Sequence, residues 1–270
     1  MTYLTTWTSL HPEILYVIIL AYLIVVFYLP VHVRRKHNFM PYWYRLHGLI
    51  SLFLLIMLIP EMIRILIRGW SWAVCDRDTF FTAPLSGWAV NLFFFSKFLD
   101  LAETVLIVLD DRRPLPIHLL HHFSTLYFVW KSIAGEVALL RPLVTVNLAA
   151  HVLLFSYLTP HKFFHIRPCY TSVALSQMAQ FVVCLFGCLR AHSVISSGKE
   201  CHITRPWLQI TTAGVLGFLF LFADFYHQKY VKFRRERACL GKHSSRERVN
   251  KQAHELRSVD KVSSPLHPSL

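Results

Sequence analysis

The sequence predicts an all-α, polytopic membrane protein in which seven transmembrane helices enclose a polar chamber. Of the 270 residues, 54% are hydrophobic and the mean hydropathy is +0.43, well above the values of ordinary soluble domains. A spanning helix needs about 20 predominantly apolar residues, and one such run in this chain also contains a cluster of histidines. The candidate runs are 14–33, 44–67, 87–109, 116–134, 144–158, 170–192 and 208–229.

The first run lacks a basic leader and a small-residue cleavage site, and Arg34, Arg35 and Lys36 follow it. We therefore expect a retained helix rather than a cleaved signal peptide. Most basic loops fall on this same side, so the positive-inside rule predicts a lumenal N-terminus and a cytosolic C-terminus. The other basic residues of that side are Arg112, Arg113, Lys162 and Arg167, and those of the opposite side are Arg77, Lys199 and Arg205.

The second run is predicted from its apolar length alone, whereas the third carries charges in mid-span. Lys97, Asp100 and Thr104 fall on one helix face at spacings i, i+3 and i+7, with Glu103 beside them. Ionisable side chains at membrane depth are costly and normally face a partner or a cavity. A self-neutralising pair of Lys97 and Asp100 is one interpretation, and a charged wall of a reaction chamber is the interpretation we favour.

The fourth run places three imidazoles within five residues. His118, His121 and His122 fall within roughly a 100° arc of one helix face. Because a cluster of ionisable groups in an apolar segment needs a polar cavity or partners, this pattern predicts a functional site.

The last three runs also carry polar residues at helical spacing. Each has an ordinary structural interpretation: a satisfied core histidine, hydrogen bonds between helices, or tyrosine anchors at the membrane interface. Taken with the third and fourth runs, they predict an enclosed polar chamber. The residues are Asn147 and His151, then Ser176, Gln177 and Gln180, then Asp224, Tyr226 and Tyr230.

The six cysteines show no zinc-ligand spacing. Only Cys75 and Cys201 fall in loops that the predicted topology places in the lumen, so we expect a disulfide between them if that compartment is oxidising. The others are expected to be inert thiols: Cys169, Cys184, Cys188 and Cys239.

Much of the net charge of +13 lies after the last run. We expect a membrane domain over 1–232 and a basic, disordered tail over 233–270. A basic segment directly beside a helix is typical of contact with anionic lipid headgroups rather than nucleic acid, although Lys232, Arg234 and Arg235 also suit the phosphates of a soluble substrate.

Several motifs together resemble the very-long-chain fatty acid elongases, the condensing enzymes of the endoplasmic reticulum. Their histidine box is matched by His118-x-x-His121-His122. The family's Lys-x-x-Glu-x-x-Asp-Thr resembles Lys97-x-x-Asp100-x-x-Glu103-Thr104 with its acidic residues exchanged. The other matches are Asn147-x-x-x-His151-x-x-Leu154-Phe155, Gln177-x-x-Gln180-Phe181, and 221–226 with Tyr230. Phe155 stands where the family usually has Tyr, and Ala174 replaces a small hydroxyl residue, so we interpret the chain as a divergent member.

The resemblance implies a chamber that also binds an acyl chain, and a condensation of malonyl-CoA with a long-chain acyl-CoA that gives a 3-oxoacyl-CoA. It needs no metal and no cofactor beyond these substrates. His121 would carry the acyl group, while His118, His122 and His151 position substrate or move protons, and Lys97 with Asp100 serves the malonyl charge. Substrate-binding roles would fall to Glu103, Thr104, Asn147, Gln177, Gln180, Tyr226, Tyr230, Lys232, Arg234 and Arg235.

The implied partners are membrane lipid and the reductases and dehydratase of an elongation cycle, and the sequence is compatible with a homo-oligomer. One rival is a di-iron desaturase or hydroxylase, which needs about eight imidazoles in three boxes. This chain offers one box and a wider pair, His161 and His165, in the wrong order. A transporter or receptor with seven helices is the other rival, but we find neither inverted repeats nor convincingly broken helices.

Overall fold

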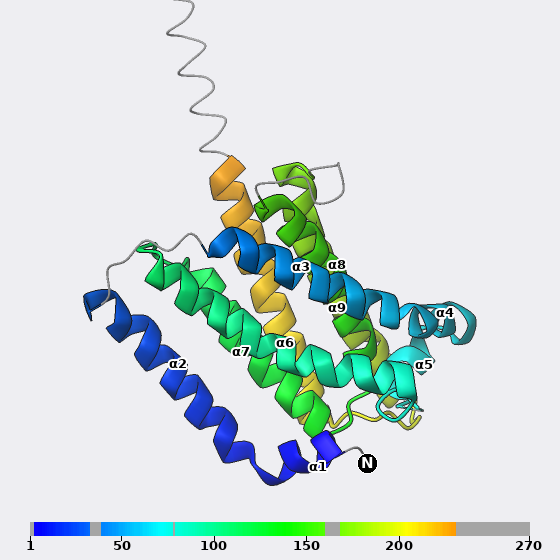
Figure 1. The fold of residues 1–270 in the computed structure, drawn as a ribbon. Helices are drawn as coiled ribbons and strands as arrows, with labels where there is room; N and C mark the ends of the chain where they lie inside the picture. Colours follow the sequence, from blue (N-terminus) through cyan, green and yellow to red (C-terminus); the bar gives the residue numbers. More distant parts are fainter. Residues whose placement is uncertain (1–2, 33–38, 78, 160–167, 231–270) are drawn as a thin grey trace, which may run out of the picture. The chain divides into compact units, whose positions relative to one another are not determined.

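The computed structural model describes residues 3–32, 39–77, 79–159 and 168–230, and within these ranges it contains helices and no strand (Figure 1). The helices are α1 Tyr3–Leu10, α2 Pro12–His32, α3 Met40–Met57, α4 Ile59–Arg68, α5 Trp70–Cys75, α6 Pro84–Leu109, α7 Pro116–Ala134, α8 Leu140–Leu158, α9 Tyr170–Ser196 and a last helix, Arg205–Tyr230. The chain divides into two compact units, Met1–Phe222 and Ala223–Leu270. The first unit holds everything described below except where the second is named.

Each predicted run corresponds to helical structure. The prediction of one continuous helix over 44–67 is wrong, however. The structure breaks it into α3 and α4, which are bent by 43°. The break comes at Leu58, and Pro60 lies in the first turn of α4, where proline is tolerated because its missing N–H would be unpaired there. The short helices α1 and α5 were not predicted, and α1 meets α2 at 75°.

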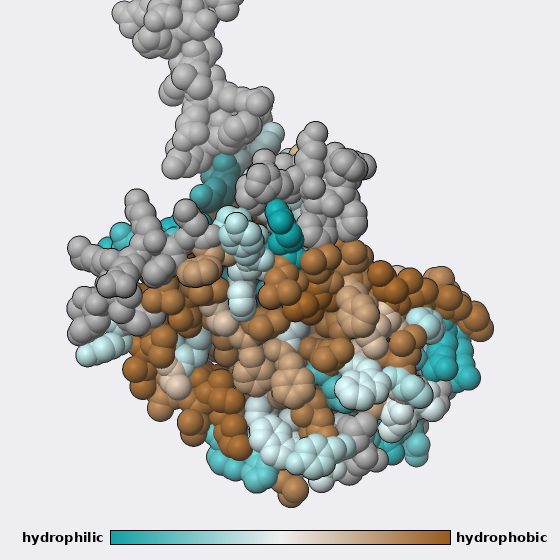
Figure 2. All heavy atoms as spheres, viewed as in Figure 1, coloured by the Kyte–Doolittle hydropathy of each residue, from teal (hydrophilic) through white to brown (hydrophobic). Residues whose placement is uncertain are grey.

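The apolar helices make this a multi-pass membrane protein. Within the described ranges α8, α9 and the last helix are long and apolar enough to span a membrane, and the count rises to five if the two bent pairs each form one span. The seven expected spans are not confirmed, because the polar residues of α6 and α7 interrupt their apolar character. Figure 2 shows apolar side chains spread across the middle of one face, as expected for a surface that contacts lipid.

The helices that carry the predicted site residues pack against one another. α3 contacts α6 and α8, α6 contacts α7, and α8 contacts α9. Proline at the start of α6 and of α7 follows a residue with extended backbone, a combination that favours a helix beginning at that point. The fully buried Trp130 of α7 and Phe94 of α6 pack ring against ring, with centroids 5.4 Å apart.

The short helix α5 is tied to the rest of the unit by what we call the α5 clamp: Cys75, Cys201, Arg141 and Glu61. A disulfide joins Cys75 to Cys201, the pair expected from the sequence. The buried Arg141 on α8 lies with its Nε 3.1 Å from Glu61 Oε2 and donates to backbone carbonyl oxygens of α5. The clamp thereby joins α4, α5, α8 and the segment between α9 and the last helix.

Several predicted residues lie outside the described ranges, as does the tail 233–270 with its predicted boundary. They are Arg34, Arg35, Lys36, His161, Lys162, His165, Arg167, Lys232, Arg234, Arg235 and Cys239.

Candidate active site

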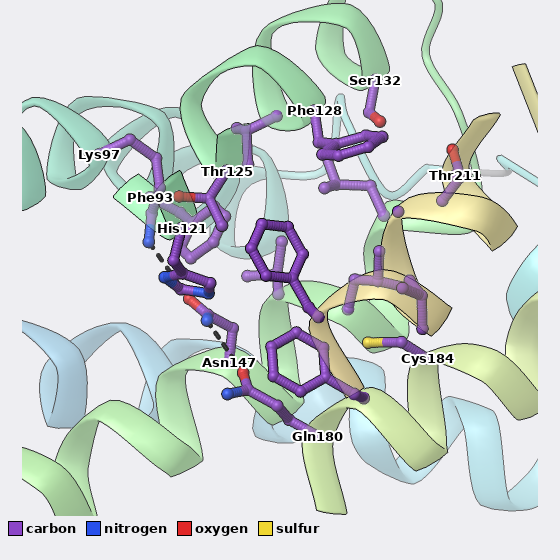
Figure 3. A pocket seen from close by; sticks show the side chains of 18 residues that line it. Phe93, Lys97, His121, Thr125, Phe128, Ser132, Asn147, Gln180, Cys184 and Thr211 are labelled. Atoms are coloured by element: carbon purple, nitrogen blue, oxygen red, sulfur yellow. Dashed lines mark hydrogen bonds between the residues drawn. The ribbon is translucent and has the colours of Figure 1, made fainter. Parts of the chain in front are cut away.

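Five helices enclose a cavity of about 100 Å³: α6, α7, α8, α9 and the last helix. Its lining is mostly apolar, but four predicted site residues meet on one side of it, namely Lys97, His121, Asn147 and Gln180 (Figure 3). We call these four residues the polar end. An apolar cavity with a few convergent polar groups is the common form of a small-molecule site.

A chain of contacts fixes the side chains of the polar end across three helices. Lys97 Nζ lies 2.7 Å from Asp100 Oδ2 and donates a hydrogen bond of 3.2 Å to Asn147 Oδ1. Asn147 Nδ2 donates to Gln180 Oε1 at 3.1 Å, and Gln180 Nε2 donates to Gln177 Oε1 at 2.8 Å. Gln177 in turn donates to a backbone carbonyl oxygen of α8 at 3.2 Å. The paired glutamines therefore orient Asn147, and Asn147 orients the ammonium group.

Asp100 lies behind Lys97, among groups that do not line the cavity. Its Oδ1 atom is 3.2 Å from His47 Nε2 and 4.0 Å from His151 Nδ1. His47 Nδ1 also lies 3.8 Å from Glu103 Oε2. Five charged or titratable side chains are therefore buried together: Lys97, Asp100, Glu103, His47 and His151. Their burial is tolerable only because each has a partner of complementary charge or a hydrogen-bonding neighbour.

His121 differs from the rest of the histidine box in that it faces the cavity. Its imidazole meets the rings of Phe181 and Phe218 edge-on, with centroids 6.1 and 5.3 Å away, and its side chain is 8% exposed. An imidazole held among aromatic rings at the edge of an apolar cavity can meet a group on a hydrophobic substrate. In chemical terms it can act as a nucleophile or move a proton.

The other two histidines of the box lie behind His121. Thr104 Oγ1 is 3.1 Å from His122 Nδ1, and the rings of His118 and His122 have centroids 3.9 Å apart. His118 Nε2 is buried and has no hydrogen-bond partner among the described residues. The predicted box is therefore one cluster in space, but only one of its three rings lines the cavity.

The far side of the cavity is apolar except for the hydroxyl groups of Ser132 and Thr211 (Figure 3). It is also narrow. A methyl group added at Gly214 would meet Phe128 Cζ at 2.6 Å, so this glycine makes room for the aromatic ring. The cavity thus has a polar end that can do chemistry and an apolar end whose dimensions depend on a few side chains.

One group of described residues has the geometry of a metal site: His47, Asp100 and His151 offer ligand atoms within 4.8 Å of one another. The Lys97 ammonium already lies 2.7 Å from Asp100, and two cations competing for one carboxylate repel each other. We therefore describe the group as part of an ion-pair network.

Tyr226 and Tyr230 belong to the second unit, where their rings stack with centroids 6.3 Å apart. His47 was missed by the sequence analysis. It is a single histidine in a predominantly apolar run, and nothing in its local sequence indicates that its partners lie on α6 and α8.

The family model described as ELO, the GNS1/SUR4 family, matches residues 7–238 of the chain. The chain belongs to this family. That range includes all of α2 to α9 and the last helix, so every described residue of the polar end lies within the ELO match.

Curated relatives agree with the assignment to the ELO family. The chain is 28% identical over 177 residues to very long chain fatty acid elongase 6 of Gallus gallus, covering 64% of this chain and 65% of that protein. It is 26% identical over 170 residues to fatty acid elongase 2 of Trypanosoma brucei brucei, covering 59% and 62%. Long chain fatty acid elongase 2 of Caenorhabditis elegans is 25% identical over 249 residues, covering 86% and 87%. The chain thus spans less than two thirds of the first two relatives.

Proposed function

We propose that this chain is a fatty acid elongase that condenses malonyl-CoA with a long-chain acyl-CoA, giving a 3-oxoacyl-CoA, CO₂ and CoA. The observation that carries the proposal is the polar end, where Lys97, His121, Asn147 and Gln180 meet at the edge of an apolar cavity. Membership of the ELO family and relatives named as fatty acid elongases support it.

The condensation needs a holder for the acyl group and a means of stabilising the malonyl carbanion. In our proposal the His121 imidazole attacks the thioester carbon of acyl-CoA, its N–H proton goes to the departing thiolate, and free CoA leaves. Malonyl-CoA then loses CO₂, and the resulting carbanion attacks the acyl-imidazole carbon. The bond to His121 breaks, and its imidazole nitrogen takes up a proton that the neighbouring histidines relay from water. His118, His122 and His151 position these groups or move protons.

Lys97 is the group that offsets negative charge in the second half-reaction. Its ammonium lies at the cavity and is fixed by Asp100 and Asn147. A cation held in place before the reaction stabilises charge that develops on the enolate oxygen without reorganisation. Glu103, Thr104 and the paired glutamines support this arrangement, and the apolar side of the cavity takes part of the acyl chain.

We further propose that α6 and α7 also cross the membrane, with their polar residues shielded from lipid by neighbouring helices. This gives the seven spans expected from the sequence, with a lumenal N-terminus and a cytosolic C-terminus in the endoplasmic reticulum. In this proposal the CoA groups stay on the cytosolic side of the membrane, and the residues proposed to bind them are Tyr226, Tyr230, Lys232, Arg234 and Arg235. Reductases and a dehydratase of the elongation cycle would consume the product.

The test is a product assay with purified protein, radiolabelled malonyl-CoA and a panel of acyl-CoAs. We expect a labelled 3-oxoacyl-CoA from wild-type protein and none from His121→Ala. His192→Ala is the matched control, because that half-buried histidine also lies in a helix, 3.3 Å from Thr212 Oγ1, but away from the polar end. No product from wild-type protein with any acyl-CoA would contradict the proposal, and desaturated product with bound iron would favour the di-iron rival.

A further inference from the structure

His47 of α3 occupies a position to which neither the histidine box nor the other motifs assign a role. Its side chain is 2% exposed, and its ring lies between two carboxylates of α6. Nε2 faces Asp100 Oδ1 at 3.2 Å, and Nδ1 faces Glu103 Oε2 at 3.8 Å. The imidazole of His151 is farther from the same oxygen, with Nδ1 at 4.0 Å.

The packing of α3 against α8 brings His47 to this position. Its ring stacks on Phe155 with centroids 4.4 Å apart and an angle of 23°. The next residue is Gly48, where an added Cβ would lie 3.1 Å from Phe155 Cβ, so a larger residue would push the two helices apart. The ring is therefore held firmly between α6 and α8.

Three of the positions at which this chain departs from the family's motifs surround His47. Asp100 and Glu103 stand in exchanged order, and Phe155 replaces a tyrosine. All three contact His47. The imidazole of α3 therefore lies where these three side chains meet.

We propose that His47 is a positioning residue that holds Asp100 and, through Asp100, fixes the Lys97 ammonium at the polar end of the cavity. The inference rests on the proposed function, because it assigns His47 to the malonyl-dependent half-reaction. Asp100 connects the two sides: Oδ1 faces the imidazole, and Oδ2 lies 2.7 Å from Lys97 Nζ. Asp100 Oδ1 accepts no hydrogen bond from the described residues, so the imidazole acts on it as a neighbouring cation-forming group at 3.2 Å. A carboxylate flanked by such groups at both oxygens favours one position for its ammonium partner, which is what stabilisation of a developing negative charge requires.

The experiment compares His47→Phe, which keeps an aromatic ring stacked on Phe155, with His47→Gln, which keeps a polar N–H group near Asp100. We expect His47→Phe to lower kcat for condensation and to raise KM for malonyl-CoA. The combined loss in kcat/KM should be roughly 10- to 100-fold, by analogy with the loss of a partner that supports a metal ligand. Release of CoA from acyl-CoA alone should not change, because His121 does not depend on Lys97 for that step.

His47→Gln should recover most of the lost kcat/KM, and His192→Phe should leave all parameters unchanged. A role in folding alone predicts a different pattern, in which both half-reactions fall together with the amount of folded protein and His47→Gln rescues neither. That pattern would overturn the proposal. An unchanged kcat/KM for malonyl-CoA in folded His47→Phe would overturn it as well.

A second measurement separates this inference from the proposed function. Mass spectrometry reports how fast Lys97 is acetylated by acetic anhydride, whether or not any condensation is found. We expect severalfold faster acetylation in His47→Phe than in wild-type protein, with His47→Gln near wild type. Equal rates in all three proteins would show that His47 does not restrain Lys97, even if wild-type protein makes 3-oxoacyl-CoA.

Discussion

The α5 clamp and the polar end of the cavity both bury a cation between helices, but they use it differently. Arg141 is 0% exposed and Lys97 is 1% exposed. Arg141 reaches Glu61 and backbone carbonyl oxygens, and its guanidinium lies over the rings of Trp72 and Phe80 at 4.1 and 5.0 Å. Lys97 has one carboxylate and one amide as partners and faces the cavity.

The difference follows from the chemistry of the two side chains. A guanidinium presents five N–H donors in a planar fork, so it can bind several acceptors at once and join elements of the fold. An ammonium is a compact point charge on a flexible stem, and at the edge of a cavity it can meet a substrate anion. We therefore expect changes in the α5 clamp to affect stability, and changes at the polar end to affect activity.

Removing the disulfide should have the largest effect on stability. Its two cysteines are 126 residues apart in sequence, and the chain-entropy model gives about 4–5 kcal/mol for so long a loop. We expect Cys75→Ser with Cys201→Ser to lower the unfolding free energy by that amount, whereas Cys169→Ser, at an exposed free thiol, should not. Condensation per folded molecule should be unchanged. Peptide mapping of unreduced wild-type protein checks the bond. Free thiols at both Cys75 and Cys201 would contradict it.

Arg141→Met should lower the unfolding free energy by about 3 kcal/mol, the lower end of the range for breaking a buried ion pair. It removes the guanidinium that lies 3.1 Å from Glu61 Oε2, whereas Arg64 Nη1 remains 3.0 Å from Glu61 Oε1. Thermal unfolding in detergent, together with the yield of monodisperse protein, measures the loss. Arg190→Met is the matched control, since Arg190 is only half-buried and donates to Ser71 Oγ. Equal stability of the two variants would show that the clamp does not stabilise the fold, and a selective loss of activity in Arg141→Met would undermine the comparison.

At the polar end we expect a loss of activity with little change in stability. Lys97→Met alone strands Asp100, so Lys97→Met with Asp100→Asn is the better test because it removes both charges. Condensation should fall roughly 10²- to 10³-fold, as on loss of one preorganised group that stabilises a developing oxyanion, while the double variant unfolds at nearly the wild-type temperature. Release of CoA from acyl-CoA alone should persist. Condensation near the wild-type rate would show that the pair is structural, like Arg141 and Glu61.

The apolar side of the cavity should give the smallest effect, in substrate choice rather than in overall activity. Gly214→Ala places a methyl group against Phe128 and forces that ring to move. We expect kcat/KM for the longest accepted acyl-CoA to fall about tenfold, the scale of one methylene in a hydrophobic pocket, with short acyl-CoAs unaffected. Gly217→Ala is the control, because an added Cβ there meets nothing within 4 Å. If both variants show the same dependence of kcat/KM on acyl length, the acyl chain does not bind at the apolar side of this cavity.

Local signals explain how much of this structure is predictable from sequence. The apolar run 116–134 predicted the bounds of α7, and Pro116 and Gly135 lie at its two ends in the structure. The disulfide was expected from the positions of two cysteines in loops. The bend near Pro60 was missed, since the apolar pattern continues through it. His47 was missed because its partners are Asp100 and Glu103, more than 50 residues away in sequence, and only the packing of α3 on α6 brings them together.

The central claim is that the polar end carries the acyl group on His121, and the direct measurement is mass spectrometry of protein incubated with acyl-CoA alone. The account predicts an acyl adduct on the peptide that contains His121, with one CoA released for each adduct. His192→Ala should behave as wild type, and His121→Ala should give neither adduct nor free CoA. If wild-type protein forms condensation product but shows no adduct, and releases CoA only when malonyl-CoA is present, then His121 acts as a base and the proposed intermediate is wrong.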